Sequence, residues 1–210
     1  MTEVLVKEVN SWHTPATEYT VAQAGNFRLC RSTCKPGHHH HQEIDGARCT
    51  KVTAPIVLTV LQEQRRGRWC DWMADDPFDY WAMQKYAAVA HGKVLTSGLG
   101  LGLVTHELVK NDKVENVTII ERSPEVIELT AKYLPKGKVT LIQGDFWEYV
   151  KQDTTQWDMI ITDIWVTHNR REHQRVLITE VIPARKYLEE KYPGTVLVFH
   201  GFWQVSDILV

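Results

Sequence analysis

Residues 93–121 are the segment that most constrains how this chain can fold. The segment reads as an apolar strand, a tight turn, a helix and a second strand that ends in Glu121. Its turn contains three closely spaced glycines, Gly98, Gly100 and Gly102. Glycines adopt positive φ angles and let a ligand approach the backbone, and an acid at the end of the next strand can accept hydrogen bonds from ribose hydroxyls. The segment therefore predicts a nucleoside-binding unit, with a tight turn that binds nothing as the alternative for the glycines alone.

The glycine spacing indicates which nucleoside to expect. A dinucleotide-binding turn has the spacing G-x-G-x-x-G/A, in which the third small residue lets the helix begin close to a pyrophosphate. That third position is Leu103 when counted from Gly98 and Thr105 when counted from Gly100. The spacing found here, G-x-G-x-G, favours a ligand without a pyrophosphate. S-adenosylmethionine is the commonest such ligand in this architecture, and we expect it as the cofactor.

The next strand and helix place a second group of candidates. Residues 139–142 read as a short strand, which Gly144 and Asp145 follow before a short helix that begins at Phe146. Asp145 has two interpretations. It caps the helix, or it accepts a hydrogen bond from an adenine amino group while Phe146 covers the ring. Both roles can hold together.

A further apolar strand over 157–163 ends in Asp163, and Trp165 follows two residues later. Ligands bind at the carboxyl ends of strands in an open parallel sheet, so we take Asp163 as a site candidate, with a capping aspartate as the alternative. Residues 170–192 have helical composition, which Pro183 should kink or split. Residues 195–199 complete the alternation, which predicts a doubly wound α/β sheet with right-handed crossovers.

Four phrases of the sequence carry a resemblance to a known family. They are VLTSGLGLGL, VTIIERSPEVIELTAKYLP, VTLIQGDFWEYV and WDMIITDIW, in this order between residues 93 and 165. This region resembles the class I S-adenosylmethionine-dependent methyltransferases, and more narrowly their spermidine synthase-like branch. The resemblance implies glycines beside the methionine part, Glu121 at the ribose, Asp145 and Phe146 at the adenine, and Asp163 at the floor of the reaction site. The cofactor-binding residues that we expect are Ser97, Gly98, Leu99, Gly100, Gly102, Glu121, Arg122, Gly144, Asp145, Phe146 and Asp163.

Two departures from the polyamine synthases bear on the reaction. Such enzymes carry an aspartate inside the glycine turn and a second acid shortly after the fourth-motif aspartate, whereas this chain has Leu101 and the uncharged residues 165–167 there. An ammonium group that loses water needs carboxylates around it. We therefore expect methyl transfer to a small molecule, in which Asp163 orients or deprotonates the acceptor, Trp165 forms a wall and His168 is an auxiliary base or a surface histidine. Two alternatives stay open: an aminopropyltransferase that uses decarboxylated S-adenosylmethionine, and a non-catalytic nucleoside-binding or interaction domain.

The first part of the chain predicts small antiparallel strands. Residues 26–32 and 49–53 read as strands, and residues 56–73 read as a β-hairpin. We expect an N-terminal β-rich region over 1–74 and an S-adenosylmethionine-binding, Rossmann-like domain over 75–210. About eleven residues follow Phe199, so the sheet either ends early or is completed by the N-terminal region. A helix expected over 78–89 adjoins the cofactor end of the sheet, and the candidates there are Asp76, Asp79 and Tyr80.

A cluster of cysteines and histidines raises the question of a metal. Cys30, Cys34, Cys49 and the histidines at 38–41 lie within twenty residues of one another. Their spacing does not match a zinc site, because the second cysteine pair is missing and four adjacent histidines cannot all reach one ion. We expect a loop over 35–43 and no metal.

Composition excludes several classes of function. The formal charge of -2, from 24 basic and 26 acidic residues, gives no field that would attract nucleic acid. No apolar stretch is as long as a membrane span, and the first residues lack the pattern of a signal peptide. Four unpatterned cysteines suit a reducing compartment, so a cytoplasmic protein with a small-molecule substrate is expected. The oligomeric state is left open, with a homodimer allowed.

Overall fold

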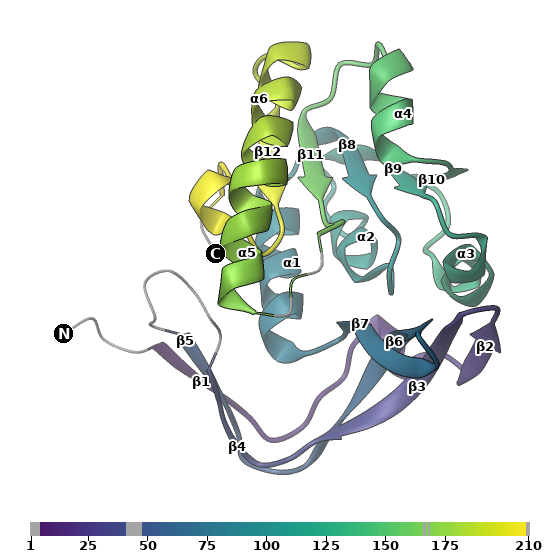
Figure 1. Ribbon diagram of the computed structural model, residues 1–210, viewed down its shortest axis with the longest axis vertical. Coiled ribbons are helices and arrows are strands. Elements are labelled where there is room, and N and C mark those ends of the chain that lie inside the picture. Colours follow the sequence, from purple (N-terminus) through teal and green to yellow (C-terminus); the bar gives the residue numbers. More distant parts are fainter. Residues whose placement is uncertain (1–4, 41–47, 166, 168, 209–210) are drawn as a thin grey trace.

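The computed structural model describes residues 5–40, 48–165, 167 and 169–208. Its central feature is a five-stranded parallel sheet in the order β10-β9-β8-β11-β12 (Figure 1). The sheet strands are β8 (Gly92–Ser97), β9 (Val114–Glu121), β10 (Val139–Gln143), β11 (Met159–Thr162) and β12 (Val196–Phe199). The doubly wound α/β sheet that the sequence predicts is therefore confirmed.

Helices cover both faces of this sheet, because successive strand residues point to opposite sides. Val94 belongs to the hydrophobic cluster that includes residues of α1, α2 and α3, whereas the next residue, Leu95, belongs to the cluster that includes residues of α4, α5 and α6. Ile119 and Ile120 divide between the two faces in the same way. The helices are α1 (Pro77–Val89), α2 (Leu103–Leu108), α3 (Pro124–Thr130), α4 (Phe146–Gln152), α5 (Arg170–Val176) and α6 (Ile182–Lys191).

The segment between α5 and α6 bears out the effect expected of Pro183. Residues Leu177–Val181 form a π-helical turn, and Pro183 lies in the first turn of α6. Proline has no N–H to donate, so its position at the start of a helix leaves no interior hydrogen bond unmade. The helical stretch expected over 170–192 is thus three consecutive pieces.

The N-terminal residues form two further sheets, which lie below the carboxyl ends of the five parallel strands in Figure 1. The larger sheet has the order β2-β3-β6-β7 and is antiparallel, and the smaller has the order β1-β5-β4. The predicted hairpin is present, with a turn at Arg66 and Gly67, whose φ angles are 50° and 76°. The strands are β1 (Leu5–Val9), β2 (Ala22–Ala24), β3 (Phe27–Cys34), β4 (Gly37–His40), β5 (Arg48–Val52), β6 (Ile56–Arg65) and β7 (Arg68–Ala74).

One part of this region differs from its prediction. The loop expected over 35–43 contains strand β4, in which His38 to His40 pair with residues of β5. Alternation along a strand points neighbouring side chains to opposite faces, so adjacent histidines are separated rather than gathered. Cys34 Sγ lies 3.5 Å from His39 Nε2, but no three potential metal ligands come together in the described part of the chain. Residues 41–47 lie outside it.

Asp75 joins the N-terminal sheet to the start of α1. The side chain is fully buried, and it accepts hydrogen bonds from the Thr14 hydroxyl at 2.6 Å and from the Thr59 N–H at 2.6 Å. Its carbonyl accepts a hydrogen bond from Trp12 Nε1 at 2.6 Å. Burial raises the pKa of Asp75, while the hydrogen bonds from Thr14 and Thr59 oppose that rise. This carboxyl group therefore connects three separate stretches of chain immediately before α1 begins at Pro77.

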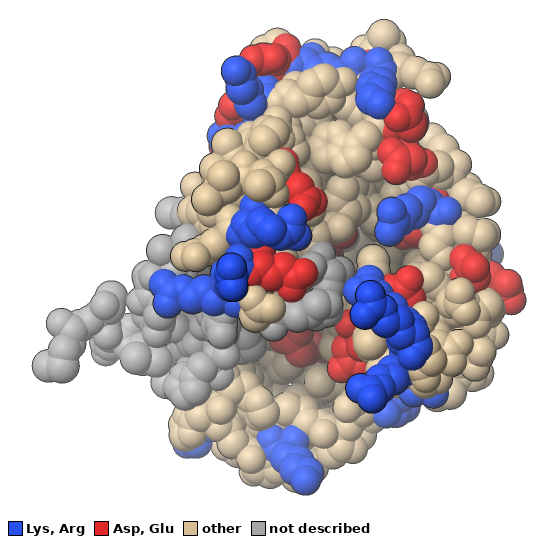
Figure 2. Space-filling model, viewed as in Figure 1, with Lys and Arg blue, Asp and Glu red and all other residues tan. Residues whose placement is uncertain are grey.

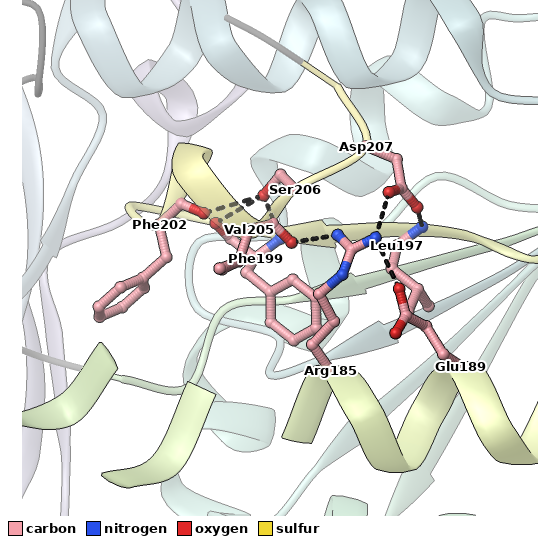
Figure 3. A network of polar contacts seen from close by, with 8 residues as sticks. All are labelled: Arg185, Glu189, Leu197, Phe199, Phe202, Val205, Ser206 and Asp207. Carbon is pink, nitrogen blue, oxygen red and sulfur yellow. Dashed lines mark hydrogen bonds and ion pairs between the residues drawn. The ribbon is translucent and has the colours of Figure 1, made fainter. Parts of the chain in front are cut away.

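The sequence left open whether the sheet ends early or is completed by the N-terminal region, and the edge at β12 bears on this question. No described strand pairs with the outer side of β12. Side chains take the place of a partner strand: Asp207 Oδ2 accepts from the Leu197 N–H at 2.8 Å, and Ser206 Oγ accepts from the Phe199 N–H at 2.9 Å (Figure 3). Arg185 from α6 donates to Asp207 Oδ1 at 2.6 Å and to the carbonyl of Val205. Among the described strands, the sheet therefore ends at β12, and no described strand of the N-terminal region pairs with it.

Nothing in the structure tests the division into domains at residue 75, which stays a prediction. Strand β7 ends at Ala74, and α1 begins at Pro77. Among the described helices, none has the length and apolar character that crossing a membrane requires.

Replacing Asp207 by asparagine should destabilise the protein, because asparagine removes the charge that faces Arg185 and weakens the acceptor for the Leu197 N–H. We expect a loss of about 1–2 kcal/mol in the free energy of unfolding. Urea denaturation followed by circular dichroism measures this loss. The matched control is Asp112→Asn at an exposed position, for which a change within about 0.5 kcal/mol is expected. Equal stabilities of the two variants would contradict this account of the sheet edge.

Candidate active site

The glycine turn between β8 and α2 adopts backbone angles that only glycine accepts without strain. The φ angles of Gly98, Gly100 and Gly102 are 83°, 51° and 68°. Close neighbours add a second reason for glycine: a Cβ on Gly98 would lie 3.2 Å from the carbonyl oxygen of Asp163. A Cβ on Gly100 would lie 2.6 Å from the sulfur atom of Met73. The turn is thus enclosed by the ends of two other strands, β11 and β7.

Glu121 points into this turn. One carboxylate oxygen accepts a hydrogen bond from the Leu99 N–H at 2.8 Å, and the other accepts from the Ser123 N–H at 2.7 Å. The residue is 7% exposed and lines the cavity beside the turn. A carboxylate oxygen can accept more than one hydrogen bond, so the same group can also receive ribose hydroxyls from the cavity side. The geometry agrees with the role predicted for Glu121, which itself stays a prediction.

A cavity of about 290 Å³ opens at the carboxyl ends of the parallel strands. In the view of Figure 2, which is that of Figure 1, the surface of the molecule is hollowed, with acidic and basic side chains both around the hollow. The structure brings most of the predicted site residues together around the cavity. Those that line it are Ser97, Gly98, Leu99, Gly100, Glu121, Arg122, Gly144, Asp145, Phe146, Asp163 and Trp165.

Two predicted residues are placed differently. Gly102 does not line the cavity. It ends the turn immediately before the first residue of α2. His168 lies outside the described residues, and its expected role as an auxiliary base stays a prediction.

Asp145 has the capping role that the sequence suggested. Its Oδ1 accepts hydrogen bonds from the N–H groups of Trp147 at 2.9 Å and Glu148 at 3.1 Å, at the start of α4. Phe146 is buried beside it, and Trp147 packs edge-on against Phe146 at a centroid distance of 4.9 Å. Trp147 also lies 6.3 Å from Trp165. Aromatic rings and one fixed carboxylate therefore meet at this end of the cavity, as a nucleobase pocket requires.

Sequence reasoning missed the wall that the N-terminal sheet provides. Phe27 on β3, and Trp72 and Met73 on β7, line the cavity. The Met73 sulfur accepts a hydrogen bond from the Leu101 N–H at 3.3 Å. Aromatic and apolar residues in a strand are usually core, so their pattern alone does not mark a binding wall.

Charged groups gather beside Asp163 at the carboxyl edge of the sheet. Asp163 follows β11, where its N–H donates to the Ser97 hydroxyl at 3.0 Å. His200 follows β12 and lies with Nε2 3.5 Å from Asp79 Oδ1 and with Nδ1 3.2 Å from the Tyr86 hydroxyl. The prediction singled out Asp79 as a candidate but not His200, which shares no recognisable motif with the other site residues.

Burial and neighbouring charges shift the pKa values of His200 and Asp163. Burial alone would lower the pKa of His200, but the charge of Asp163 and the hydrogen bond and charge of Asp79 outweigh burial and raise it from 6.5 to about 9. Asp163 is accessible from the cavity, yet the protein atoms around it exclude enough water to raise its pKa; His200 opposes this rise and Asp79 adds to it. At neutral pH the cluster therefore contains an imidazolium held among carboxyl groups.

Asp76 and Tyr80, also singled out from the sequence, have structural partners. Asp76 caps α1 by accepting from the Phe78 N–H at 2.9 Å, and burial and the neighbouring Asp79 raise its pKa well above 3.8. The Tyr80 hydroxyl donates to Glu107 at 2.5 Å and is turned toward α2. Neither residue lines the cavity.

Part of this chain is similar to known proteins. Residues 82–177 match the spermine/spermidine synthase domain. A spermidine synthase from Dictyostelium discoideum is 41% identical over 78 residues, which cover 34% of this chain and 28% of the relative. A polyamine aminopropyltransferase from Buchnera aphidicola subsp. Acyrthosiphon pisum (strain Tuc7) is 30% identical over 100 residues, covering 42% and 35%. The chain thus spans about a third of the length of these curated relatives.

A solved structure is also similar. It is a spermidine synthase in complex with the transition-state analogue AdoDATO, with a TM-score of 0.48, 21% sequence identity, and coverage of 67% of this chain and 53% of that chain.

These matches overturn the expectation of methyl transfer. The matching family is that of spermine and spermidine synthases, and the matching curated relatives are named for polyamine synthesis or aminopropyl transfer. The expectation depended on the lack of acids at Leu101 and at 165–167. Outside the motifs that were compared, Asp79 in the first turn of α1 acts electrostatically on Asp163.

Residues 82–177, which contain the glycine turn and most of the parallel sheet, are thus similar to the spermine/spermidine synthase domain.

Proposed function

We propose that this chain binds decarboxylated S-adenosylmethionine and transfers its aminopropyl group to an amine. The adenosyl part would lie between Glu121 and the aromatic residues around Phe146, and the reacting carbon would lie near Asp163. The names of the curated relatives support the proposed reaction. The residues that line the cavity support the proposed position of the ligand.

The state of the glycine turn is the observation that carries this proposal. S-adenosylmethionine has a carboxylate, for which a turn of this kind would provide free N–H groups. Here four of the five N–H groups of residues 98–102 already donate to protein acceptors. The four bonds run from Gly98 to the Ile120 carbonyl, from Leu99 to Glu121, from Leu101 to the Met73 sulfur and from Gly102 to the Leu99 carbonyl. Such a turn favours the decarboxylated compound, which has no carboxylate to place there.

The acidic groups beside the cavity support an amine as the acceptor. An ammonium group that leaves water needs carboxylates in reach, and Asp163 lines the cavity with Asp79 beside it. The amine nitrogen forms a bond to the carbon next to the sulfonium while the carbon–sulfur bond breaks and its electron pair stays on sulfur. Asp163 can hold the amine in line and accept the proton that it loses. Trp165 packs against Phe199 at 5.9 Å and forms a fixed wall beside this position.

Decarboxylated S-adenosylmethionine should bind at least about tenfold more tightly than S-adenosylmethionine, a difference of about 1.4 kcal/mol. The reason is that the carboxylate would meet amides that are already engaged. Isothermal titration calorimetry with both compounds measures this preference. Tighter binding of the carboxylated compound would refute the proposal.

Replacing Glu121 by glutamine should weaken nucleoside binding and destabilise the fold, because the glutamine NH₂ group would face one of two backbone donors. We expect a loss of about 1–3 kcal/mol in the free energy of unfolding. Calorimetry with 5′-methylthioadenosine should show an affinity reduced by about tenfold or more, since a ribose acceptor is lost. Glu115→Gln, at an exposed position of the same strand, is the control and should change neither quantity. Unchanged nucleoside affinity in Glu121→Gln would remove Glu121 from the site.

Replacing Asp163 by asparagine should lower aminopropyl transfer by about 100-fold or more while nucleoside binding persists, since asparagine cannot accept the proton of the amine. Transfer is measured as release of 5′-methylthioadenosine with short aliphatic diamines as acceptors. If the wild-type protein binds the nucleoside but transfers nothing to any amine, the alternative of a non-catalytic nucleoside-binding domain holds instead.

A further inference from the structure

His200 lies outside the segment that matches the family, yet it adjoins the residue at the floor of the cavity. The matched segment ends at residue 177, and His200 follows β12. Its backbone N–H donates to the Thr162 carbonyl at 2.9 Å, which fixes it beside the residue that precedes Asp163. Its side chain is only 12% exposed. An imidazole in this position is enclosed by the protein and next to the site.

The groups that face His200 come from two elements. Asp76, Asp79 and Tyr86 belong to the start and body of α1, and Asp163 follows β11. Asp79 contacts Nε2 and Tyr86 contacts Nδ1, so both ring nitrogens have partners. Among the described residues, the positive charge that acts on Asp163 is that of His200. Without a ligand, the imidazolium therefore balances carboxyl groups that would otherwise repel one another.

We propose that His200 is a positioning residue that exchanges its proton for a cationic substrate: it balances Asp79 and Asp163 in the empty protein and becomes neutral when an ammonium group binds beside Asp163. This inference rests on the proposed function. Two positive charges next to the same carboxyl groups disfavour each other, so the ammonium makes the imidazolium easier to deprotonate. The neutral imidazole is then close to Asp163 when the attacking amine loses its proton.

This exchange has a direct thermodynamic consequence. Burial opposes the charged imidazole, and the carboxyl groups outweigh burial, so the pKa of His200 near 9 depends on the negative charges of Asp163 and Asp79. A bound ammonium compensates those charges and returns the pKa toward the lower value that burial favours. Between that lowered pKa and about pH 9, binding of the amine must therefore release a proton from the protein.

Calorimetry in two buffers of different ionisation enthalpy tests the proposal. The protein is saturated with 5′-methylthioadenosine at pH 8, and 1,4-diaminobutane is titrated in. Wild type should release about one proton per amine bound. His200→Gln, which keeps a polar group within reach of Asp79, should still bind but release at most about a fifth of that amount. His91→Gln is the matched control, because His91 is an exposed histidine beside Asp158, and it should behave as wild type.

A second measurement keeps the proposal testable if His200→Gln does not fold. The imidazole C2–H resonance of His200 in the wild-type protein is titrated by NMR with and without 1,4-diaminobutane. The amine should lower the pKa of His200 by about two units or more, as a release of nearly one proton at pH 8 requires.

The outcomes separate this inference from the proposed function. Amine binding with a proton release that His200→Gln abolishes, or with a lowered pKa of His200, supports the inference. Amine binding with the same proton release in both proteins, or with an unchanged pKa of His200, overturns the inference and leaves the proposed function intact. If none of the short diamines binds to the wild-type protein, the proposed function and the inference both fail.

Discussion

The two hydrogen bonds that Glu121 accepts are the interaction on which the site depends. One bond reaches Leu99 in the glycine turn, and the other reaches Ser123 at the start of α3. A single buried carboxylate thus fixes the turn after β8 to the end of β9 and to the next helix. Because charged acceptors make stronger hydrogen bonds than neutral ones, these two bonds hold the backbone of the turn firmly. A cavity built on a fixed turn loses little conformational entropy when it is filled.

The N-terminal sheets turn an open edge into an enclosed cavity. The carboxyl ends of the parallel strands would otherwise face solvent, and Phe27, Trp72 and Met73 close one side of them. The buried Asp75 holds this arrangement, because it joins Trp12, Thr14 and Thr59 just before α1. Helix α1 in turn carries Asp79 to the edge of the site. The hydrogen bonds of Asp75 therefore hold both the N-terminal sheet that lines the cavity and the helix that carries Asp79.

Side chains occupy the outer edge of the parallel sheet at β12, where no described strand pairs. Ser206 and Asp207 satisfy the N–H groups of Phe199 and Leu197 with side-chain oxygens, and Arg185 anchors Asp207 to α6. An edge with satisfied donors offers less opportunity for pairing with another chain. This arrangement also holds β12 in place, and with it His200 at the strand's carboxyl end.

The sequence by itself determined the order of strands and helices, the glycine turn, Glu121, and the position of Asp163 at a strand end. These features follow from local hydrophobic patterns and from the rule that parallel strands share one carboxyl edge. Only the tertiary structure decided that Met73 covers the glycine turn, that Asp79 and His200 stand beside Asp163, and that side chains close the sheet at β12. These residues lie far apart in the chain, and no local pattern encodes which of them meet. For that reason the motifs alone indicated a site poor in acids and the wrong group transfer, while packing brought the acidic groups in from a neighbouring helix.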